Sequence, residues 1–322
     1  MAPVLQVRGL TTRFRTSGGI VTAVDGVSFD VAAGETLAIV GESGSGKSVT
    51  ALSILRLIPS PPGRIEAGEV LFEGTDLLKL DDAGIRAMRG NKIAMIFQEP
   101  MSSLNPGLTV GMQVAEPIVR HQRSAWANAL NAAKGLLDSV RIPDSARRLA
   151  AYPHQFSGGM SQRVMIAMAL ACAPRLIIAD EPTTALDVTV QAQILDLLKA
   201  RAVETEAAMI MITHDLGVVA RYADRVAVMY GGRIVETAPA RDLYRNPRHP
   251  YTRGLMASVP RMDAAHDERL VPIDGQPPDL ARLPPGCAFA PRCRSAIARC
   301  QTERPALVEA APRHMKACLI DG

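Results

Sequence analysis

Apolar and polar positions along this chain of 322 residues follow two patterns, one typical of strands and one typical of helices. Three continuous apolar runs have the length of fully buried parallel strands: 35–40, 176–180 and 209–213. Alternating positions over 4–31 predict a strand pair, and those over 225–236 predict a hairpin. Residues 100–153 show helical periodicity and few strand signals. The pattern therefore predicts an α/β fold with an inserted helical subdomain at about 100–165.

Shorter signals add detail to this outline. Residues 68–72 and 93–97 have the composition of strands, whereas 49–58, 125–140 and 161–171 have helical patterns: five further elements in all. The intervening stretch Pro-Ser-Pro-Pro-Gly at 59–63 breaks the chain after the first of these helices. The helix at 161–171 follows Ser157, Gly158 and Gly159, which resemble an N-cap that leaves several N–H groups free to bind an anion.

The run at 35–40 leads directly into a glycine-rich loop, and a helix follows that loop. The loop matches the P-loop pattern of a glycine, four residues and Gly-Lys-Ser, in the strand–loop–helix context that the pattern requires. Its glycines let backbone N–H groups converge on phosphate oxygens, Lys47 reaches the β- and γ-phosphates, and the Ser48 hydroxyl binds Mg²⁺. The chain is therefore predicted to bind a nucleoside triphosphate. The predicted phosphate-binding residues are Gly41, Glu42, Ser43, Gly44, Ser45, Gly46, Lys47, Ser48 and Val49.

Two further strands deliver polar side chains to their carboxyl ends, where ligands bind in open parallel sheets. Asp180 ends the run at 176–180 and Glu181 follows it; Asp180 is predicted to orient the Mg²⁺ shell, and Glu181 to polarise the attacking water. The alternative is an ordinary strand end with solvated acids. His214 follows the run at 209–213; its alternatives are a structural histidine and, at this ligand-binding edge of the sheet, a contact with the γ-phosphate. Phe14 is either a platform on which adenine stacks, contributing about 1–3 kcal/mol, or an ordinary core residue.

Composition limits the cellular setting. The formal net charge is +4, and the N-terminus lacks a basic segment followed by an apolar one, so no secretory signal is expected. No apolar stretch is long enough to span a bilayer, which predicts a cytoplasmic protein that reaches a membrane only through a partner. Basic residues concentrate between Ala281 and Cys318, which suits either nucleic acid or an anionic metal centre.

Four of the five cysteines lie in this basic tail: Cys287, Cys293, Cys300 and Cys318. Cysteines of a cytosolic chain do not predict disulfides. Zinc sites favour closely spaced cysteine pairs, which the tail lacks, and the longer spacings are compatible with an iron–sulfur cluster. Zinc and four reduced thiols remain the alternatives. Cys172 lies apart on an apolar helix and is expected in the core.

The motifs occur in the order found in ATP-binding subunits of ABC transporters, and the chain resembles that family from about residue 5 to its end. Besides the P-loop and the acids, it has Gln98 of the Q-loop, the signature loop at 156–162, the D-loop at 185–187 and the switch His214. The resemblance implies a mixed sheet with an antiparallel β subdomain, an ATPase domain over 1–240 and a C-terminal extension over 241–322. It implies that Phe14 stacks on adenine and that Gln98 serves catalysis and the Mg²⁺ site.

Three segments are similar to the oligopeptide/dipeptide importer branch, which also includes nickel and other small-solute carriers: 98–106, 157–160 and 246–252. The tail at 286–293 resembles D-type subunits, some of which hold a [4Fe–4S] cluster. Met160 departs from the broad ABC pattern but is usual in this branch, whereas Ser161 stands where the branch often has a basic residue.

The resemblance also implies partners and alternatives. ATP would lie between the P-loop of one subunit and Ser157, Gly158, Gly159, Met160 and Asp187 of another. The expected assembly is peripheral to the cytoplasmic face of the plasma membrane, with two permease subunits, an extracytoplasmic binding protein and a second ATPase subunit, related or identical. A soluble ABC ATPase acting on nucleic acid or ribosomes usually has two cassettes or a coiled-coil insertion, and the sequence shows neither. Intact Glu181 and His214 disfavour a switch without turnover.

Overall fold

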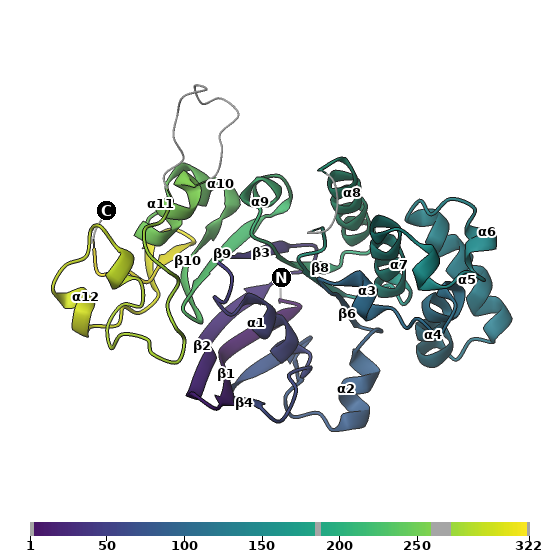
Figure 1. Ribbon diagram of the computed structural model, residues 1–322, viewed down its shortest axis with the longest axis horizontal. Helices are drawn as coiled ribbons and strands as arrows, with labels where there is room; N and C mark the ends of the chain where they lie inside the picture. The colour runs from purple at the N-terminus through teal and green to yellow at the C-terminus, as the bar shows by residue number, and fades with distance from the viewer. Residues whose placement is uncertain (1–2, 184–187, 259–271, 321–322) are drawn as a thin grey trace. The chain divides into compact units, whose positions relative to one another are not determined.

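The computed structural model describes residues 3–183, 188–258 and 272–320, which form two compact units (Figure 1). The first unit is built mainly from Lys79–Ile212. The second is built from Gln6–Asp30, Thr36–Leu78 and the described residues from Thr213 onward. Each unit contains β-sheet and helices, as the α/β pattern predicted.

Parallel strands form the centre of the first unit. β7 (Leu176–Asp180) pairs with β6 (Ile93–Ile96) on one side and with β8 (Ala208–Ile212) on the other. Every residue of β7 and β8 is buried, which explains why these strands are apolar throughout rather than alternating. The predicted parallel strands at 176–180 and 209–213 are thus confirmed, with β8 shifted by one residue.

Helices complete the first unit, and the segment predicted to be helical is helical. Three of its helices pack together: α4 (Val110–Gln122), α5 (Trp126–Ser139) and α7 (Gly158–Leu170) (Figure 1). On α5, Ala129, Ala133 and Leu137 follow one another at four-residue spacing and are fully buried. The other elements here are α2 (Asp82–Met88), α3 (Pro100–Ser103), α6 (Ser145–Arg148), η1 (Pro153–Gln155) and α8 (Val188–Glu204).

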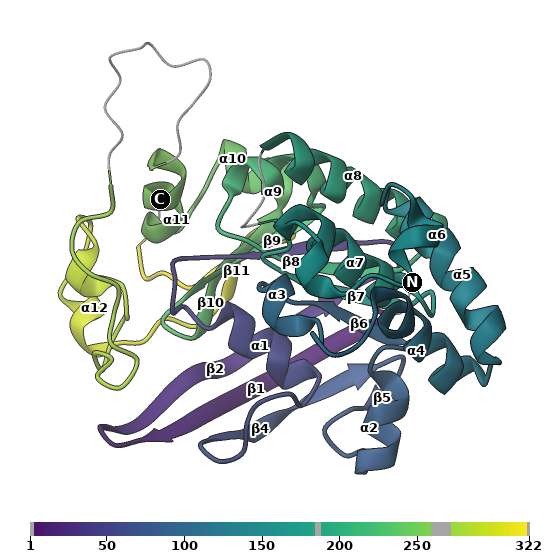
Figure 2. The same cartoon turned by 45° about the vertical axis from the view of Figure 1, so that its right-hand side comes forward.

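A four-stranded sheet in the second unit contains the predicted N-terminal strand pair. Its strand order is β2 (Gly19–Val31), β1 (Leu5–Thr16), β4 (Gly63–Phe72) and β5 (Thr75–Asp76) (Figure 2). The β1–β2 turn is closed by the Thr16 hydroxyl, which donates to the carbonyl of Gly19 at 2.9 Å. β4 begins at Gly63, five residues earlier than its apolar pattern predicted, because its first half is polar and largely exposed.

The second unit also contains strands around the P-loop. β3 (Thr36–Val40) pairs in parallel with β9 (Arg225–Tyr230), which forms a hairpin with β10 (Arg233–Pro239). Gly231 and Gly232 have φ angles of 57° and 79°, as a two-residue type I′ turn requires, so the predicted hairpin is confirmed. The tail extends the sheet, since β12 (His314–Lys316) pairs with β10 and β11 (Val308–Ala311) pairs with β12.

Short helices complete the second unit. α1 (Lys47–Ile54) is shorter than the predicted helix at 49–58, because Arg56 adopts a left-handed φ of 52° and Pro59 follows. The others are α9 (Leu216–Tyr222), α10 (Ala240–Arg245), α11 (Pro250–Ala257), η2 (Ala290–Arg292) and α12 (Arg299–Thr302).

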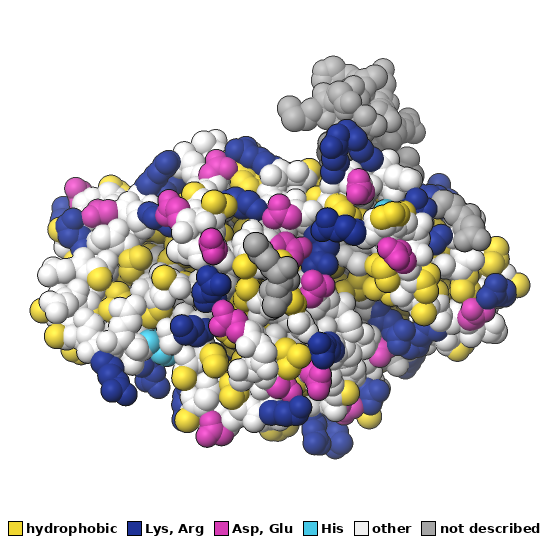
Figure 3. Space-filling view, turned by 180° about the vertical axis from the view of Figure 1, so that it is seen from behind, with side chains coloured by type: hydrophobic (Ala, Val, Ile, Leu, Met, Phe, Trp, Pro, Cys, Tyr) yellow, Lys and Arg dark blue, Asp and Glu magenta, His cyan; other side chains and the backbone are white. Residues whose placement is uncertain are grey.

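Two properties of the surface bear on partners. Among the helices that the structure describes, none combines the length and the apolar character needed to cross a membrane. On the face drawn in Figure 3, lysine and arginine side chains alternate with acidic ones rather than gathering in one large basic area.

Candidate nucleotide-binding site

Buried strand β3 leads into the P-loop, whose curl depends on its glycines. Gly41, Gly44 and Gly46 have φ angles of 153°, 76° and 103°, which residues with a Cβ rarely adopt. A Cβ on Gly41 would lie 2.2 Å from the carbonyl oxygen of Met229, and one on Gly46 would lie 2.3 Å from that of Ala23. The loop therefore rests directly on neighbouring backbone, and only glycine fits at these two positions.

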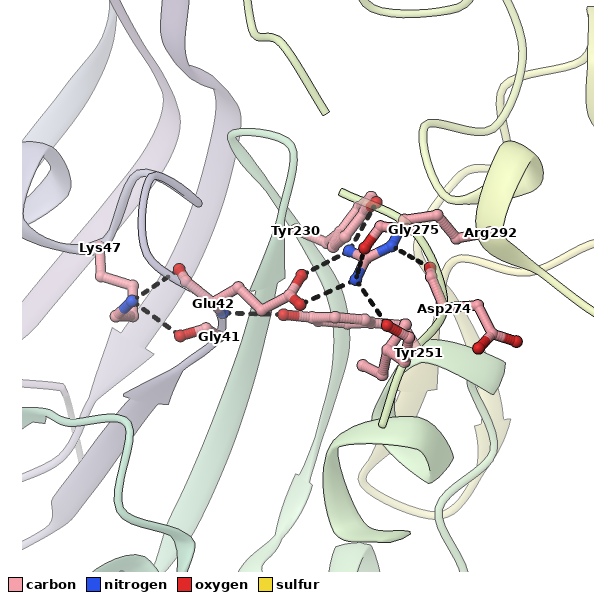
Figure 4. A network of polar contacts seen from close by, with 9 residues as sticks. Gly41, Glu42, Lys47, Tyr230, Tyr251, Asp274, Gly275 and Arg292 are labelled. Atoms are coloured by element: carbon pink, nitrogen blue, oxygen red, sulfur yellow. Dashed lines mark hydrogen bonds and ion pairs between the residues drawn. The ribbon is translucent and has the colours of Figure 1, made fainter. Parts of the chain in front are cut away.

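Lys47 lies inside this curl. Only 7% of Lys47 is exposed, and its Nζ donates to the carbonyl oxygens of Gly41 and Glu42 at 2.8 and 2.9 Å (Figure 4). The buried Ser45 hydroxyl has no hydrogen-bond partner among the described residues, and no side chain caps the start of α1. A buried cation, an unpaired hydroxyl and an uncapped helix N-terminus together fit a phosphate group.

Two other predicted nucleotide contacts lie in the same unit as the P-loop. Phe14 is half-buried on β1, and its ring passes so close to Gly63 that a Cβ there would lie 2.7 Å from it. His214 follows the end of β8 and precedes α9, with an exposed side chain. Their contacts with adenine and the γ-phosphate remain predictions from the sequence.

The first unit brings the Q-loop and the acidic strand end together. β7 ends at Asp180, which is 5% exposed, and the next residue, Glu181, adopts a left-handed φ of 46°. The amide of Gln98 donates to the carboxylate of Glu181 at 3.0 Å. A non-glycine residue in this conformation is strained, and such strain concentrates at functional sites. The backbone turn and the amide contact fix where the Glu181 carboxylate points.

The signature loop forms the N-terminus of α7. The Ser157 hydroxyl caps the helix by accepting from the N–H of Met160 at 3.3 Å, as predicted. Ser157 and Gly158 are exposed, and Gly159 and Met160 are half-buried. The N–H groups of Gly158 and Gly159 lie in the first turn, where a helix supplies no acceptors for them. This end of α7 can therefore offer N–H groups to an external anion.

The predicted site residues thus fall into two groups, one in each unit. The second unit carries Phe14, residues 41–49 and His214; the first carries Gln98, residues 157–160, Asp180 and Glu181. Asp187 of the predicted D-loop lies outside the described residues. The P-loop and the residues predicted to act on water, Gln98 and Glu181, therefore come from different parts of the chain.

The tail gathers its four cysteines. Cys287, Cys293, Cys300 and Cys318 line one cavity with about 10 Å³ of free space, room for about one water molecule. Burial raises the pKa of Cys287 and of Cys293 above that of an ordinary thiol. Within the described ranges, no group of three or more His, Cys, Asp or Glu side chains is arranged to hold a metal ion. As placed, the thiols therefore do not form a ready-made metal site.

Two residues that contact the P-loop were not predicted from the sequence, Tyr251 and Arg292, and neither was Tyr230 beside them. Tyr251 and Arg292 contact Glu42 directly, and Tyr230 lies beside Arg292 (Figure 4). Tyr251 and Arg292 lie within segments that resemble the peptide importer branch, so a signal was present. The resemblance of these segments indicates a family, but it does not predict which residues Tyr251 and Arg292 contact.

Comparison with known proteins decides the family. The family model described as ABC transporter matches residues 24–184. A second model, described as the C-terminal region of oligopeptide/dipeptide transporters, matches residues 235–300. This chain belongs to the ABC transporter family. The order of motifs predicted that family, and the second match confirms the resemblance of the tail.

Relatives and solved structures agree with this assignment. The chain is 52% identical to the dipeptide transport ATP-binding protein DppD of Bacillus subtilis, over 99% of this chain and 95% of that protein. It is 51% identical to a putative peptide import ATP-binding protein of Brucella melitensis, over 98% and 97%. A dimeric ATP-binding cassette in a post-hydrolysis state, bound to ADP and Pi, superposes with a TM-score of 0.67 at 30% identity, over 74% and 99%. The ABC ATPase fold and the ATPase activity predicted from the motifs are thereby confirmed.

Proposed function

We propose that this chain is the ATP-hydrolysing subunit of an importer for oligopeptides or dipeptides. Two features support the substrate class: relatives named for peptide transport, and the match of residues 235–300 to the C-terminal region of peptide transporters. The observation that carries the catalytic part is the 3.0 Å contact between Gln98 and Glu181 at the end of β7. Nickel or another small solute is the alternative cargo.

Each predicted site residue has a separate role in phosphoryl transfer. In this proposal the P-loop N–H groups and Lys47 bind the β- and γ-phosphates, and Phe14 stacks on adenine. Ser48, Asp180 and Gln98 would hold Mg²⁺, which neutralises phosphate charge. Glu181 takes a proton from the attacking water and orients it, and His214 contacts the γ-phosphate.

A second ATPase subunit completes each nucleotide site in this proposal. Ser157 and the N–H groups of Gly158 and Gly159 bind the γ-phosphate held by the P-loop of the partner, and Asp187 contributes from the D-loop. ATP then joins the two subunits and hydrolysis separates them, while Gln98 and the helical subdomain pass the motion to a membrane subunit. The second subunit is either a related ATPase or a copy of this chain.

The proposed assembly lies on the cytoplasmic face of the plasma membrane. It contains two permease subunits and works with an extracytoplasmic binding protein that selects the cargo. A nucleic-acid partner is disfavoured because soluble ABC ATPases of that kind usually carry two cassettes or a coiled-coil insertion, and the sequence shows neither. Purification in mild detergent from native membranes tests the assembly. Permease subunits in the eluate support it, and ribosomes or nucleic acid without permeases contradict it.

Glu181→Gln tests the catalytic assignment. The amide keeps the size of the side chain but cannot accept the proton from water, so ATP binding should persist while turnover falls by about a thousandfold or more. The variant should also accumulate as an ATP-bound dimer on size-exclusion chromatography. Asp196→Asn, a carboxylate-to-amide change on α8, is the matched control and should hydrolyse ATP at the normal rate. Normal hydrolysis by Glu181→Gln would remove the role given to Glu181.

We further propose that the four tail thiols bind a metal group, with a [4Fe–4S] cluster ahead of zinc. The support is that all four line one cavity; binding would require the thiols to deprotonate and the cavity of about 10 Å³ to widen. Anaerobic purification followed by iron, sulfide and zinc analysis tests this proposal. Four irons per chain support the cluster, stoichiometric zinc without iron selects the alternative, and a metal-free protein rejects both.

A further inference from the structure

One arginine of the C-terminal extension reaches the P-loop. Arg292, at the end of η2, donates from its two terminal nitrogens to both carboxylate oxygens of Glu42, at 2.6 and 2.9 Å (Figure 4). Only 6% of the Arg292 side chain and 24% of the Glu42 side chain are exposed. Bidentate arginine–carboxylate pairs are among the strongest hydrogen-bonded contacts in proteins, and burial protects this one from screening by salt.

The extension holds Arg292 in place from several sides. Its Nε donates to the carbonyl oxygen of Asp274 at 2.9 Å, and a terminal nitrogen lies 3.4 Å from the carbonyl oxygens of Ile273 and Gly275. The guanidinium lies 5.9 Å from the ring centre of Tyr230, within cation–π range. Hydrogen bonds with Glu42 raise the pKa of Arg292 above its ordinary value, so the arginine stays charged at any accessible pH. The donor geometry is therefore set before any ligand arrives.

The backbone of Glu42 is held as well as its side chain. Its N–H donates to the hydroxyl of Tyr251 at 2.8 Å, and its carbonyl accepts from Lys47 at 2.9 Å. Tyr251 is fully buried and packs against Tyr230 and Phe289, with ring centres 4.5 and 5.4 Å away. Glu42 therefore contacts Tyr251, Lys47 and Arg292, and two of these residues, Tyr251 and Arg292, lie beyond residue 240. The extension thus fixes the residue whose carbonyl holds the P-loop lysine.

We propose that Arg292 is a positioning residue of the nucleotide site, which fixes the first turn of the P-loop through Glu42 and thereby raises the affinity for ATP. The inference rests on ATP binding at the P-loop and adds that the C-terminal extension is part of that site. Without Arg292, the turn that carries Glu42 gains freedom, and ordering it again on binding opposes affinity. The groups that act on water lie in the other unit. The KM for ATP should therefore rise while kcat changes little.

Titration of the full chain with a fluorescent ATP analogue tests this proposal. Arg292→Ala should raise the dissociation constant about tenfold, which corresponds to about 1.4 kcal/mol of binding free energy. Arg299→Ala is the matched control, because Arg299 also makes a bidentate pair in the tail, with Glu303, but is 65% exposed. The control should bind the analogue within about twofold of the unchanged chain, as expected for an exposed ion pair.

A double-mutant cycle separates positioning from general support of the fold. In the background of Glu42→Ala, Arg292→Ala should cause little further loss of affinity, because the contact is already absent. Additive losses would show that Arg292 does not act through Glu42. Should Arg292→Ala fail to fold, Glu42→Gln probes the same contact without altering the tail and should weaken binding severalfold; unchanged binding there overturns the proposal.

Lys47→Ala distinguishes failure of the positioning role from failure of the proposed function. If the unchanged chain binds no nucleotide, the function itself is wrong. If the unchanged chain binds, Lys47→Ala loses binding and Arg292→Ala binds normally, only the role of Arg292 is wrong.

Discussion

Two helices of this chain have glycine at the N-cap or in the first turn, and their N-termini are built in opposite ways. α1 follows the P-loop, where three glycines have positive φ angles and no side chain caps the helix. α7 follows Ser157, which has an ordinary extended φ of −71° and caps the helix with its hydroxyl. Lys47 at the start of α1 is buried, whereas Ser157 and Gly158 at the start of α7 are exposed.

This difference shows which part of an anion site one chain can build alone. A curled, buried loop surrounds a phosphate, and its strained backbone is maintained by the strands and the tail packed around it. A regular, exposed helix N-terminus presents a few N–H groups on a surface and can only complete a site formed elsewhere. The P-loop end is therefore expected to govern nucleotide binding, and the α7 end to govern events that need a second subunit.

Replacing a glycine by alanine at each helix N-terminus should give the largest difference between α1 and α7 in stability and nucleotide binding. Gly46→Ala would place its Cβ 2.3 Å from the carbonyl oxygen of Ala23, whereas a Cβ on Gly158 meets nothing within 4 Å. Gly46→Ala should lower the free energy of unfolding by about 3 kcal/mol or more and abolish nucleotide binding. Gly158→Ala should leave both unchanged. Urea unfolding with nucleotide titration checks both variants. Equal effects of the two substitutions would contradict the distinction between the α1 and α7 N-termini.

Lys47→Ala tests the buried end without straining its backbone. Loss of the ammonium removes the predicted charged contact to the β- and γ-phosphates, so nucleotide affinity should fall by about a hundredfold, or about 2.7 kcal/mol. Lys134→Ala is the control, since Lys134 lies on α5 in an exposed pair with Asp138. A fluorescent-nucleotide titration measures both variants. An affinity loss below about threefold for Lys47→Ala would place the phosphates elsewhere.

The features that could be predicted from the sequence are those that depend on a short local pattern of residues. The P-loop, the strand that ends at Asp180 and the cap at Ser157 each need only a few consecutive residues, because strand, turn and cap chemistry act over that range. The Gln98–Glu181 contact was not predicted, although both residues follow neighbouring parallel strands, whose carboxyl ends meet at one edge of the sheet.

Contacts between distant segments could not be predicted in this way. Glu42 and Arg292 are 250 positions apart, and neither has a periodic pattern that points to the other. Likewise, β12 is only three residues long, too short for its alternation to reveal that it pairs with β10. Family resemblance marked the segment around Arg292, but only the folded chain shows that it contacts the P-loop.

Acid should destabilise the fold through a residue that supports the P-loop contacts. Burial lowers the pKa of His249 to about 4, although the nearby Glu236 carboxylate opposes the shift. His249 caps α11 by accepting from the N–H of Tyr251, the residue that holds Glu42. Because the folded pKa lies below the unfolded value, His249 contributes its full stability above pH 6.5 and loses it as pH falls toward 4.

The free energy of unfolding should therefore fall by about 2 kcal/mol from this residue between pH 7 and pH 5. His249→Asn, which can still cap the helix, should flatten that part of the profile when unfolding is followed in urea at several pH values. His154→Asn is the control: His154 is exposed in η1 of the first unit, and its replacement should leave the slope unchanged. An unaltered slope in His249→Asn would assign the acid sensitivity to other groups.

The smallest expected effect on stability comes from the cap of α7, and it tests the exposed end directly. Ser157→Ala removes a cap and should lower the free energy of unfolding by about 1 kcal/mol. Thr109→Ala is the matched control, because Thr109 caps α4 in the same way, by accepting from the N–H of Met112 at 3.3 Å. The two variants should lose similar stability and bind nucleotide as the unchanged chain does.

ATP turnover in the assembled transporter should separate these two caps. Only Ser157→Ala should slow turnover, because in the proposed dimer only α7 presents its N-terminus to the nucleotide of a second subunit. Equal turnover in both variants would reduce Ser157 to a structural cap. Weakened nucleotide binding by isolated Ser157→Ala chains would show instead that the N-terminus of α7 acts at the nucleotide site of its own chain. The P-loop and α7 would then not have separate roles.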